Sequence, residues 1–426
     1  MLQSETVKKY DTYKDSGIEW IGEIPQEWGL TKIGQVYDER NEKVSDKDYQ
    51  PLSVTKNGVV PQLETAAKTD NGDNRKLVKI NDFAINSRSD RRGSCGISEY
   101  EGSVSLINTV LSPRKNMCNK YYNYTFKSEC FADEFYKWGN GIVDDLWSTK
   151  WSAMKNIYIP NPKLEEQQRI ADYLDKKCGE IDRVVETEKA VIEKLKEYKQ
   201  SIITEAVTKG LDKSVPLKDS GIEWIGKIPQ HWETCKLLKL YKERKCKNKG
   251  NIETNVLSLS YGNIKKRNVE NNMGLLPESF ETYNIIVPDN IVLRLTDLQN
   301  DHRSLRCGLV KEQGIITSAY VTLEKKLDNI SSNYYYRLLH TFDIMKGFYG
   351  MGDGVRQNLK YDGELCNLLV VRPPYAEQQQ IAKYLDKKCS EIDKAIADKE
   401  QVIEKFTEYK KSLIYECVTG KRKVVA

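Results

Sequence analysis

Residues 161–210 read NPKLEEQQRIADYLDKKCGEIDRVVETEKAVIEKLKEYKQSIITEAVTKG, and this stretch decides the fold. Asn161 is a favourable N-cap, Pro162 suits the first helical position, and Gly210 is a typical stop after a last helical turn. Acidic residues such as Glu166 follow at the start, near the positive end of the helix dipole. The signals predict one long helix, roughly 65 Å in length at the usual rise per residue.

Apolar residues recur along this helix at alternating spacings of four and three, which is the pattern of a coiled-coil seam. The predicted seam comprises Ile170, Leu174, Lys177, Ile181, Val184, Glu188, Val191, Leu195, Tyr198 and Ile202. A compact domain does not need a helix of this length to fill its core. Pairing with a second helix is therefore favoured over packing along the helix's own domain.

The same sequence returns near the C-terminus. QQIAKYLDKKC at residues 379–389 repeats QRIADYLDKKC at residues 168–178. The second predicted seam comprises Ile381, Leu385, Lys388, Ile392, Ala395, Lys399, Val402, Phe406, Tyr409 and Leu413. The chain is therefore expected to contain two matched helices.

Another phrase, KDSGIEWIG, occurs at residues 14–22 and again at residues 218–226, and a proline and a tryptophan follow both copies. The chain thus divides into two similar halves, about 1–210 and 211–426.

Between the repeated phrases lie two segments of about 130 residues with short β-type runs broken by Gly, Asn and Asp. The predicted strands include 49–55, 78–85 and 103–111 in the first segment and 255–260, 285–295 and 315–323 in the second. Each segment is expected to form a mixed α/β or mostly β globule.

The predicted fold is therefore α+β, with two globular mixed α/β domains joined by two long helices in an antiparallel coiled coil and a pseudo-two-fold tandem repeat. We expect residues 1–160 to hold the N-terminal segment and the first globule, and 161–212 the first long helix. Residues 213–372 would hold the second repeated phrase and the second globule, and 373–426 the second long helix and the C-terminal tail.

Composition excludes several classes of protein. The net charge of +5 on 426 residues argues only weakly for a polyanionic partner. There is no apolar run long enough for a membrane span and no apolar stretch at the N-terminus typical of a signal peptide, so we expect a cytoplasmic protein. The ten cysteines form no Cys-x-x-Cys pair and the three histidines lie far apart, so neither a disulfide framework nor a metal site is predicted.

The two globules differ most in loops rich in Arg, Asn, Gln, Ser and Thr, whose side chains can bond base edges and phosphates. In the first half the candidate DNA-binding residues are Lys56, Asn57, Arg88, Arg91 and Arg92. In the second half they are Tyr261, Asn263, Lys265, Lys266, Arg294, Arg303, Arg306 and Arg356. The alternative for any one of them is an ordinary solvated loop residue.

Motifs that would indicate catalysis are incomplete. GIEWIGK at residues 221–227 fits the start of a phosphate-binding loop, but Ile228 stands where a Ser or Thr would hold magnesium. Arg372 precedes Pro-Pro-Tyr where an adenine methyltransferase needs an amide or carboxylate to bond the flipped base. A nuclease-like pattern of Asp289 with residues 324–326 is short enough to arise by chance. No catalytic residue is predicted.

Charged residues in the predicted seams are unusual. Glu188 and Lys399 occupy equivalent positions near the middle of the two helices, where a charge is costly unless it is paired. We hypothesise that they partner each other or a nearby group. Lys177 and Lys388 either extend their ends to solvent or face a partner.

The paired KDSGIEWIG phrases and the paired YLDKKC helices resemble the specificity subunit of Type I restriction-modification enzymes, over nearly the whole chain. The resemblance implies two target recognition domains that each read half of a bipartite, asymmetric double-stranded DNA site. It implies helices that set the spacing and dock two methyltransferase subunits, with restriction subunits completing the complex. It implies no cofactor in this chain, because S-adenosylmethionine, ATP and magnesium belong to the partner subunits. A rival hypothesis is a coiled-coil scaffold whose globules bind proteins.

Overall fold

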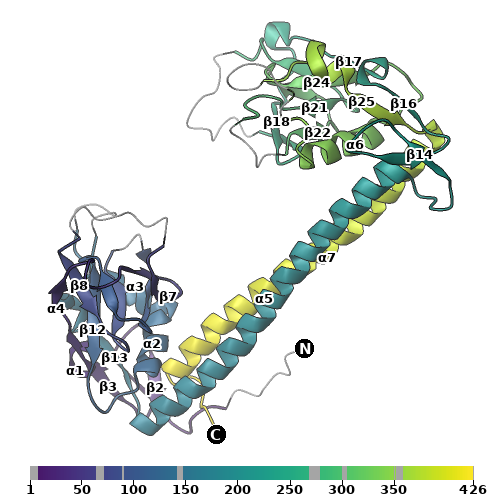
Figure 1. The fold of residues 1–426 in the computed structure, drawn as a ribbon. Helices are drawn as coiled ribbons and strands as arrows, with labels where there is room; N and C mark the ends of the chain where they lie inside the picture. Colours follow the sequence, from purple (N-terminus) through teal and green to yellow (C-terminus); the bar gives the residue numbers. More distant parts are fainter. Residues whose placement is uncertain are drawn as a thin grey trace. The chain divides into compact units, whose positions relative to one another are not determined.

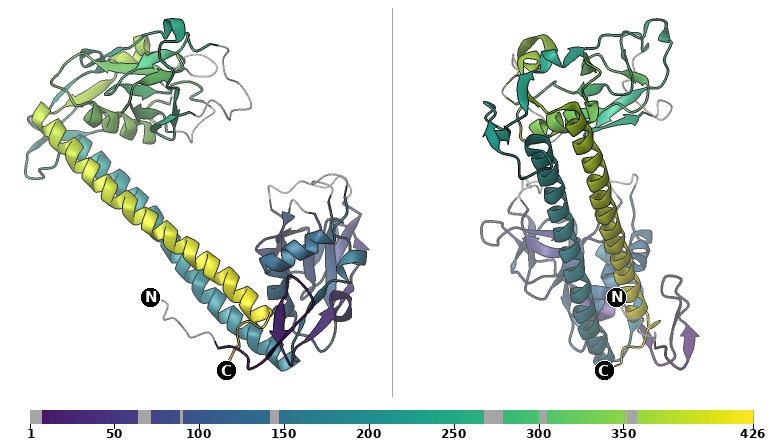
Figure 2. Two further views of the ribbon diagram at one scale, coloured as in Figure 1. Left: turned by 180° about the vertical axis from the view of Figure 1, so that it is seen from behind. Right: turned by 90° about the vertical axis from the view of Figure 1, so that its right-hand side faces the viewer.

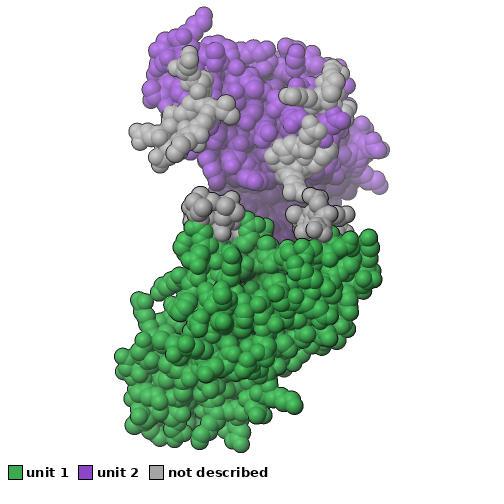
Figure 3. All heavy atoms as spheres, turned by 90° about the vertical axis from the view of Figure 1, so that its left-hand side faces the viewer, with its two compact units in different colours: residues 1–189, 400–426 green, residues 190–399 purple. Residues whose placement is uncertain are grey.

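The computed structural model describes residues 8–63, 72–88, 91–141, 147–267, 279–299, 305–349, 351 and 358–425. It consists of two compact units, which Figure 3 shows in different colours. Unit 1 comprises residues 1–189 and 400–426, and unit 2 comprises residues 190–399. Each unit contains one globule and a portion of each long helix.

The two long helices are α5, Leu164–Lys209, and α7, Tyr375–Val418 (Figures 1 and 2). Within unit 2, Lys199 Nζ of α5 lies 2.6 Å from Asp393 Oδ1 of α7. Within unit 1, Lys410 Nζ of α7 lies 2.7 Å from Asp182 Oδ1 of α5. In each unit the portions of the two helices lie side by side and run antiparallel (Figures 1 and 2), and the prediction of two matched, paired helices is confirmed.

The first long helix begins later than predicted. Asn161 belongs to strand β13, Tyr158–Asn161, and pairs with Gly29 of β3, Gly29–Lys32. Its side-chain oxygen accepts hydrogen bonds from Tyr122 and Gln167 instead of capping the helix. The sheet pairing holds residue 161 in extended conformation, so helical hydrogen bonding starts only at the carbonyl of Lys163.

The predicted end of α5 is confirmed. Gly210 has φ +77°, and its N–H donates to the carbonyl of Ala206 at 3.1 Å. The left-handed backbone that glycine adopts at low cost lets the chain leave the helix at this point.

Most positions of the predicted seam in α5 are buried or half-buried, with two exceptions. The buried apolar residues of α5 are Ile170, Ala171, Leu174, Cys178, Ile181, Ile192, Ile203, Ala206 and Val207. Val184 and Tyr198, which the seven-residue pattern places in the seam, are 37% and 59% exposed. The four buried isoleucines recur every eleven residues, which is three helical turns of about 3.67 residues each. This value is close to the natural period of the α-helix. Isoleucines at this spacing therefore stay on one face without the left-handed supercoil that a seven-residue repeat requires.

Every position of the predicted seam in α7 is buried or half-buried. Ile381, Leu385 and Ile392 of α7 are buried, whereas Leu195 of α5 and Phe406 of α7 are half-buried.

The globule of unit 1 is built from small antiparallel sheets. A four-stranded sheet has the order β10 (Cys95–Ile97), β9 (Phe83–Asn86), β12 (Asn108–Pro113), β4 (Tyr37–Glu39). A three-stranded sheet has the order β11 (Gly102–Val104), β8 (Arg75–Val78), β5 (Lys43–Val44). Two-stranded pairs are β1 (Tyr13–Asp15) with β2 (Glu23–Pro25), β3 with β13, and β6 (Leu52–Thr55) with β7 (Gly58–Pro61). The helices are α1 (Ile33–Val36), α2 (Asn119–Lys127), α3 (Glu129–Lys137) and α4 (Trp151–Met154).

Unit 2 repeats this arrangement almost strand for strand. Its four-stranded sheet has the order β17 (Tyr241–Glu243), β24 (Val321–Lys325), β21 (Ile291–Leu293), β22 (Cys307–Leu309). The pairs are β14 (Leu217–Asp219) with β15 (Lys227–Pro229), β16 (Glu233–Lys236) with β25 (Leu369–Arg372), β18 (Leu257–Ser260) with β19 (Asn263–Lys266), and β20 (Asn284–Ile286) with β23 (Gly314–Ile316). Helix α6 is Ser332–Ile344, and short helical segments are Leu237–Lys239, Lys249–Asn251 and Tyr361–Leu365. The tandem repeat predicted from the sequence is thus a repeat of the fold.

Several runs that were each predicted as one strand contain parts of two strands in the structure. The run 78–85 contains the end of β8 and the start of β9, separated by a turn at Asn81 with φ +71°. The run 285–295 is divided in the same way at Asp289, with φ +70°. Each turn passes the chain from one sheet to another, and Asn and Asp tolerate the left-handed conformation that the turn needs. Runs 103–111 and 315–323 are likewise divided, at residues 105–107 and 317–320.

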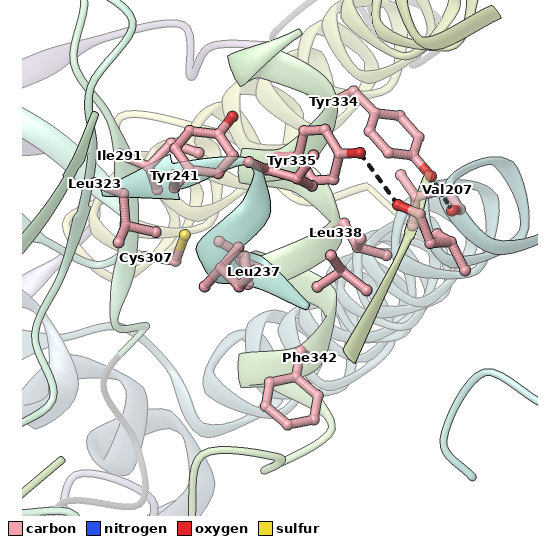
Figure 4. Close-up of a cluster of buried hydrophobic side chains, with 14 of the residues drawn as sticks. Val207, Leu237, Tyr241, Ile291, Cys307, Leu323, Tyr334, Tyr335, Leu338 and Phe342 are labelled. Carbon is pink, nitrogen blue, oxygen red and sulfur yellow. Dashed lines mark hydrogen bonds between the residues drawn. The ribbon is translucent and has the colours of Figure 1, made fainter. Parts of the chain in front are cut away.

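An aromatic core joins the globule of unit 2 to the helices of the same unit (Figure 4). Tyr334 and Tyr335 of α6 are fully buried, and their rings meet at a centroid distance of 5.1 Å. The Tyr334 hydroxyl donates to the carbonyl of Val207 in α5, and that of Tyr335 donates to Val371 in β25. Helix and globule within the unit are therefore held by buried hydrogen bonds as well as by apolar packing.

The cysteines that the structure describes are free, and Cys95, Cys178, Cys307 and Cys389 are among the buried ones. Among the described residues, no group of three or more His, Cys, Asp or Glu side chains is placed to bind a metal ion. Nor do the described helices include one with the length and apolar character needed to cross a membrane.

Candidate nucleic-acid interface

Predicted DNA-binding residues lie at equivalent hairpin turns in the two units. In unit 1, β6 and β7 pair Thr55 with Gly58, and Lys56 and Asn57 form the exposed turn. In unit 2, β18 and β19 pair Ser260 with Asn263 around a turn of Tyr261 and Gly262. The same place on the scaffold thus carries different side chains in the two halves.

A glycine lets each hairpin lie directly on the four-stranded sheet. A Cβ added to Gly96 in β10 would lie 2.7 Å from the Cα of Gly58. A Cβ added to Gly308 in β22 would lie 2.6 Å from a methyl of Leu259. These close approaches explain the Cys-Gly pair that both halves share, since the cysteine is buried and the glycine leaves room for the hairpin.

The hairpin of unit 1 is stiffened by its own side chains. The Thr55 hydroxyl donates to the carbonyl of Gly58 at 3.0 Å and accepts from the N–H of Asn57 at 3.1 Å. Lys56 and Asn57 are therefore presented to solvent from an ordered turn. An ammonium group can pair with a phosphate, and an amide can bond the edge of an adenine.

The hairpin of unit 2 has one apolar and one polar face. Leu257 and Leu259 are buried beneath it, and Ser258 on the other face pairs with Lys265. Asn263 and Lys265 are exposed on that polar face. Lys266, opposite Leu257, is exposed as well. Alternation along the strands therefore places Asn263 and Lys265 on the face away from the buried leucines, whereas Lys266 lies at the exposed edge of the leucine face.

The arginine-rich loop of unit 1 is only partly accessible. Arg91 and Arg92 are exposed, and Arg92 pairs with Asp133. Arg88 is half-buried, and its N–H donates to the side-chain oxygen of Asn86. Arg294 of unit 2 is half-buried as well.

The prediction that Arg306 contacts DNA is corrected by its burial. The residue is fully buried, and its guanidinium donates to the carbonyls of Arg294 at 3.1 Å and Thr296 at 2.9 Å. Its N–H donates to the carboxylate of Asp343. A guanidinium occupied by the chain's own carbonyls holds a loop together and cannot reach a base. Arg303 and Arg356 lie outside the described residues.

A cavity of about 730 Å³ lies within unit 2 between the hairpin, α6 and the unit's portion of the long helices. Tyr336, Arg337 and His340 of α6 contribute to its lining, and none of them was predicted as a site residue. Burial, with the positive charges of Arg337 and Lys199, lowers the pKa of His340 to about 4, so the imidazole is neutral at pH 7. A lone histidine in an apolar helical pattern gives no sequence signal for this position.

Residues 25–197 match the family model of the Type I restriction modification DNA specificity domain. The type I restriction enzyme MjaX specificity subunit of Methanocaldococcus jannaschii is 25% identical, with 95% of this chain and 96% of that protein covered. The MjaVIII specificity subunit of the same organism is 24% identical, with 94% of each chain covered. This chain is therefore similar to Type I restriction enzyme specificity subunits over nearly its whole length.

Solved structures show the same fold. A chain from a study of complex assembly and conformational transition in the type I R-M system superposes with a TM-score of 0.68 at 12% identity, over 93% of this chain and 98% of that one. The HsdS subunit from Thermoanaerobacter tengcongensis superposes with a TM-score of 0.51 at 14% identity, over the same shares. The duplicated globules and long helices of this chain therefore form the same fold as these two solved structures.

Proposed function

We propose that this chain is the specificity subunit of a Type I restriction-modification enzyme and reads a bipartite, asymmetric double-stranded DNA sequence, one half with each globule. The observation that supports this most is the pair of equivalent hairpins. The same scaffold presents Lys56 and Asn57 in unit 1 and Tyr261 and Gly262 in unit 2. Like frameworks with unlike tips suit the recognition of two different half-sites.

The residues at these tips supply both kinds of contact that sequence-specific binding needs. Lys56, Lys265 and Lys266 offer positive charge for phosphates, which positions the protein on the duplex. Asn57 and Asn263 offer amides that can form two hydrogen bonds with an adenine in the major groove. We assign Arg91 to the first half-site, since it is exposed and guanidinium groups pair with guanine.

In this proposal the chain is not itself catalytic. Two methyltransferase subunits dock on the long helices, and restriction subunits join them, so S-adenosylmethionine, ATP and magnesium are bound by partners. Exposed helix faces are the candidate docking surfaces. In unit 2 such a face includes Tyr198, 59% exposed, and Tyr384, 37% exposed. Between the half-sites, the helices set the number of unspecified base pairs.

A map of N6-methyladenine tests the proposal in cells that express this chain with its neighbouring methyltransferase. We expect a bipartite motif that disappears when the chain is deleted. Exchanging residues 30–160 for those of another specificity subunit should change one half of the motif and leave the other half intact. An unchanged methylome, together with the absence of salt-dependent DNA binding by the assembled complex, would favour a protein-binding scaffold instead.

A further inference from the structure

Tyr261 is an exposed aromatic residue at the tip of the β18 and β19 hairpin. Its side chain is 76% exposed, so the ring lies outside the core of unit 2. Its φ is +46°, and that of Gly262 is +76°. Two successive left-handed residues define a tight hairpin turn that normally contains Asn, Asp or Gly at its first position. A tyrosine there carries both backbone strain and exposed apolar surface.

The backbone beneath Tyr261 is firmly held. The Tyr336 hydroxyl of α6 donates to the carbonyl of Gly262 at 3.3 Å, and Ser260 pairs with Asn263 directly below the turn. Gly308 lets the hairpin lie against β22. The ring therefore projects from a rigid platform and would lose little conformational freedom on binding.

The scaffold itself does not require an aromatic residue at this position. The equivalent residue of unit 1 is Lys56, which is absent from the residues with positive φ, and the left-handed conformation there falls on Gly58 at +111°. A two-residue hairpin at the same place in the fold is thus built with a different turn and without strain at its first turn residue. Strained residues of this sort occur where they serve a function, so Tyr261 is a candidate for one.

The surroundings of Tyr261 indicate the kind of ligand. Asn263, Lys265 and Lys266 are exposed on the same hairpin, so the ring stands among groups suited to base edges and phosphates. An aromatic ring in such a setting can stack on a base or contact the methyl group of thymine. Neither contact depends on charge.

We propose that Tyr261 is a specificity-determining residue for the second half-site, making apolar contact with one base through its ring. The inference rests on the proposed DNA recognition and adds to it the chemistry of one contact. The lysines of the hairpin hold phosphates, whereas Tyr261 discriminates among bases.

The decisive variant is Tyr261→Asn, measured in the full chain assembled with its methyltransferase subunits. Asparagine accepts the left-handed backbone, so folding should be at least as stable as in the parent. Affinity for the cognate duplex should fall on the order of tenfold. The slope of log affinity against log salt should stay the same, because no charge is lost. Lys265→Ala should instead lower that slope by about one.

Three controls sharpen the test. Tyr261→Phe keeps the ring and should keep the affinity. Ile252→Asn removes another apolar side chain of unit 2, one that is 77% exposed but outside the hairpin, and should leave binding unchanged. Duplexes with deoxyuridine in place of each thymine test for contact with a thymine methyl group, since the parent but not Tyr261→Asn should then respond at one position of the second half-site.

The possible results separate the two proposals. If the parent complex binds its motif and Tyr261→Asn matches it in affinity and in methylation pattern, the role of Tyr261 is wrong while DNA recognition stands. A weaker Tyr261→Asn complex with a lower salt slope would also overturn the apolar contact. If the parent complex shows no salt-dependent DNA binding, both the proposed DNA recognition and the proposed role of Tyr261 are wrong.

Discussion

Tyr334 of α6 donates a hydrogen bond of 2.7 Å to the backbone carbonyl of Val207 in the last turn of α5. The same bond occurs in unit 1, where the Tyr121 hydroxyl of α2 donates to the carbonyl of Val418 at 2.8 Å. Carbonyls in a last helical turn lack a partner within the helix. A buried tyrosine from each globule supplies it, so each globule caps the C-terminal end of a long helix in its own unit.

The first prediction concerns these caps. Tyr334→Phe should reduce the free energy of unfolding by about 1 to 3 kcal/mol, because it leaves a buried carbonyl without a donor. Tyr121→Phe should behave alike. Tyr198→Phe, in which the ring is 59% exposed, serves as the control and should have little effect. Urea denaturation of the full chain measures the difference, and equal stability of all three variants would show that the caps contribute nothing.

The second prediction compares two arginines. Arg306→Ala should lower the free energy of unfolding by about 3 kcal/mol, since it removes a fully buried guanidinium and leaves the carbonyls it serves without donors. Arg91→Ala should keep stability and weaken DNA binding, because that side chain is exposed. Melting temperature and DNA affinity, measured on both variants, check the assignment. The structural role assigned to Arg306 is wrong if Arg306→Ala is as stable as the parent.

The third prediction concerns the helix seam. Ile192→Ala and Ile203→Ala should each lower the free energy of unfolding by about 2 to 4 kcal/mol, because both side chains are buried. Tyr198→Ala should be nearly neutral. A seven-residue seam would place Tyr198 inside and predicts the reverse order. Thermal denaturation of the three variants therefore distinguishes the two periods.

The fourth prediction is a pH dependence. His340 has a folded pKa of about 4, whereas an unfolded histidine titrates near 6.5. Between these values the unfolded chain binds the proton and the folded chain does not, so stability falls as pH decreases from 6.5 to 4. The contribution is roughly 3 kcal/mol at most. His340→Gln should lose this part of the pH dependence in denaturation curves. If the variant and the parent show the same dependence of stability on pH, the lowered pKa of His340 is wrong.

The fifth prediction tests the hypothesis for Glu188 and Lys399. If these residues partner each other, Glu188→Lys and Lys399→Glu together should be milder than the sum of the single changes. A double mutant as destabilised as that sum would exclude the pairing. Denaturation of the four chains of this cycle gives the coupling energy.

Much of the architecture followed from the sequence alone. The repeated phrases showed the duplication, because two copies of one sequence fold in one way, and Gly210 marked the end of α5, because few other residues adopt its φ of +77°. Long-range sheet pairing, by contrast, has no local signal. Residue 161 was therefore assigned to the helix although β13 holds it, and strands 78–85 and 285–295 were each predicted as one.

The sequence also determined which residue types could meet DNA, but only the tertiary structure decided which of them are placed to do so. Arg306 and Arg91 are alike in sequence terms, yet one is enclosed by the carbonyls of its own loop and the other is exposed. Tyr261 became distinctive only through its left-handed backbone and exposed ring. Chemistry is carried by the side chain, whereas accessibility depends on packing between segments far apart in the chain, and packing is settled only when the whole unit folds.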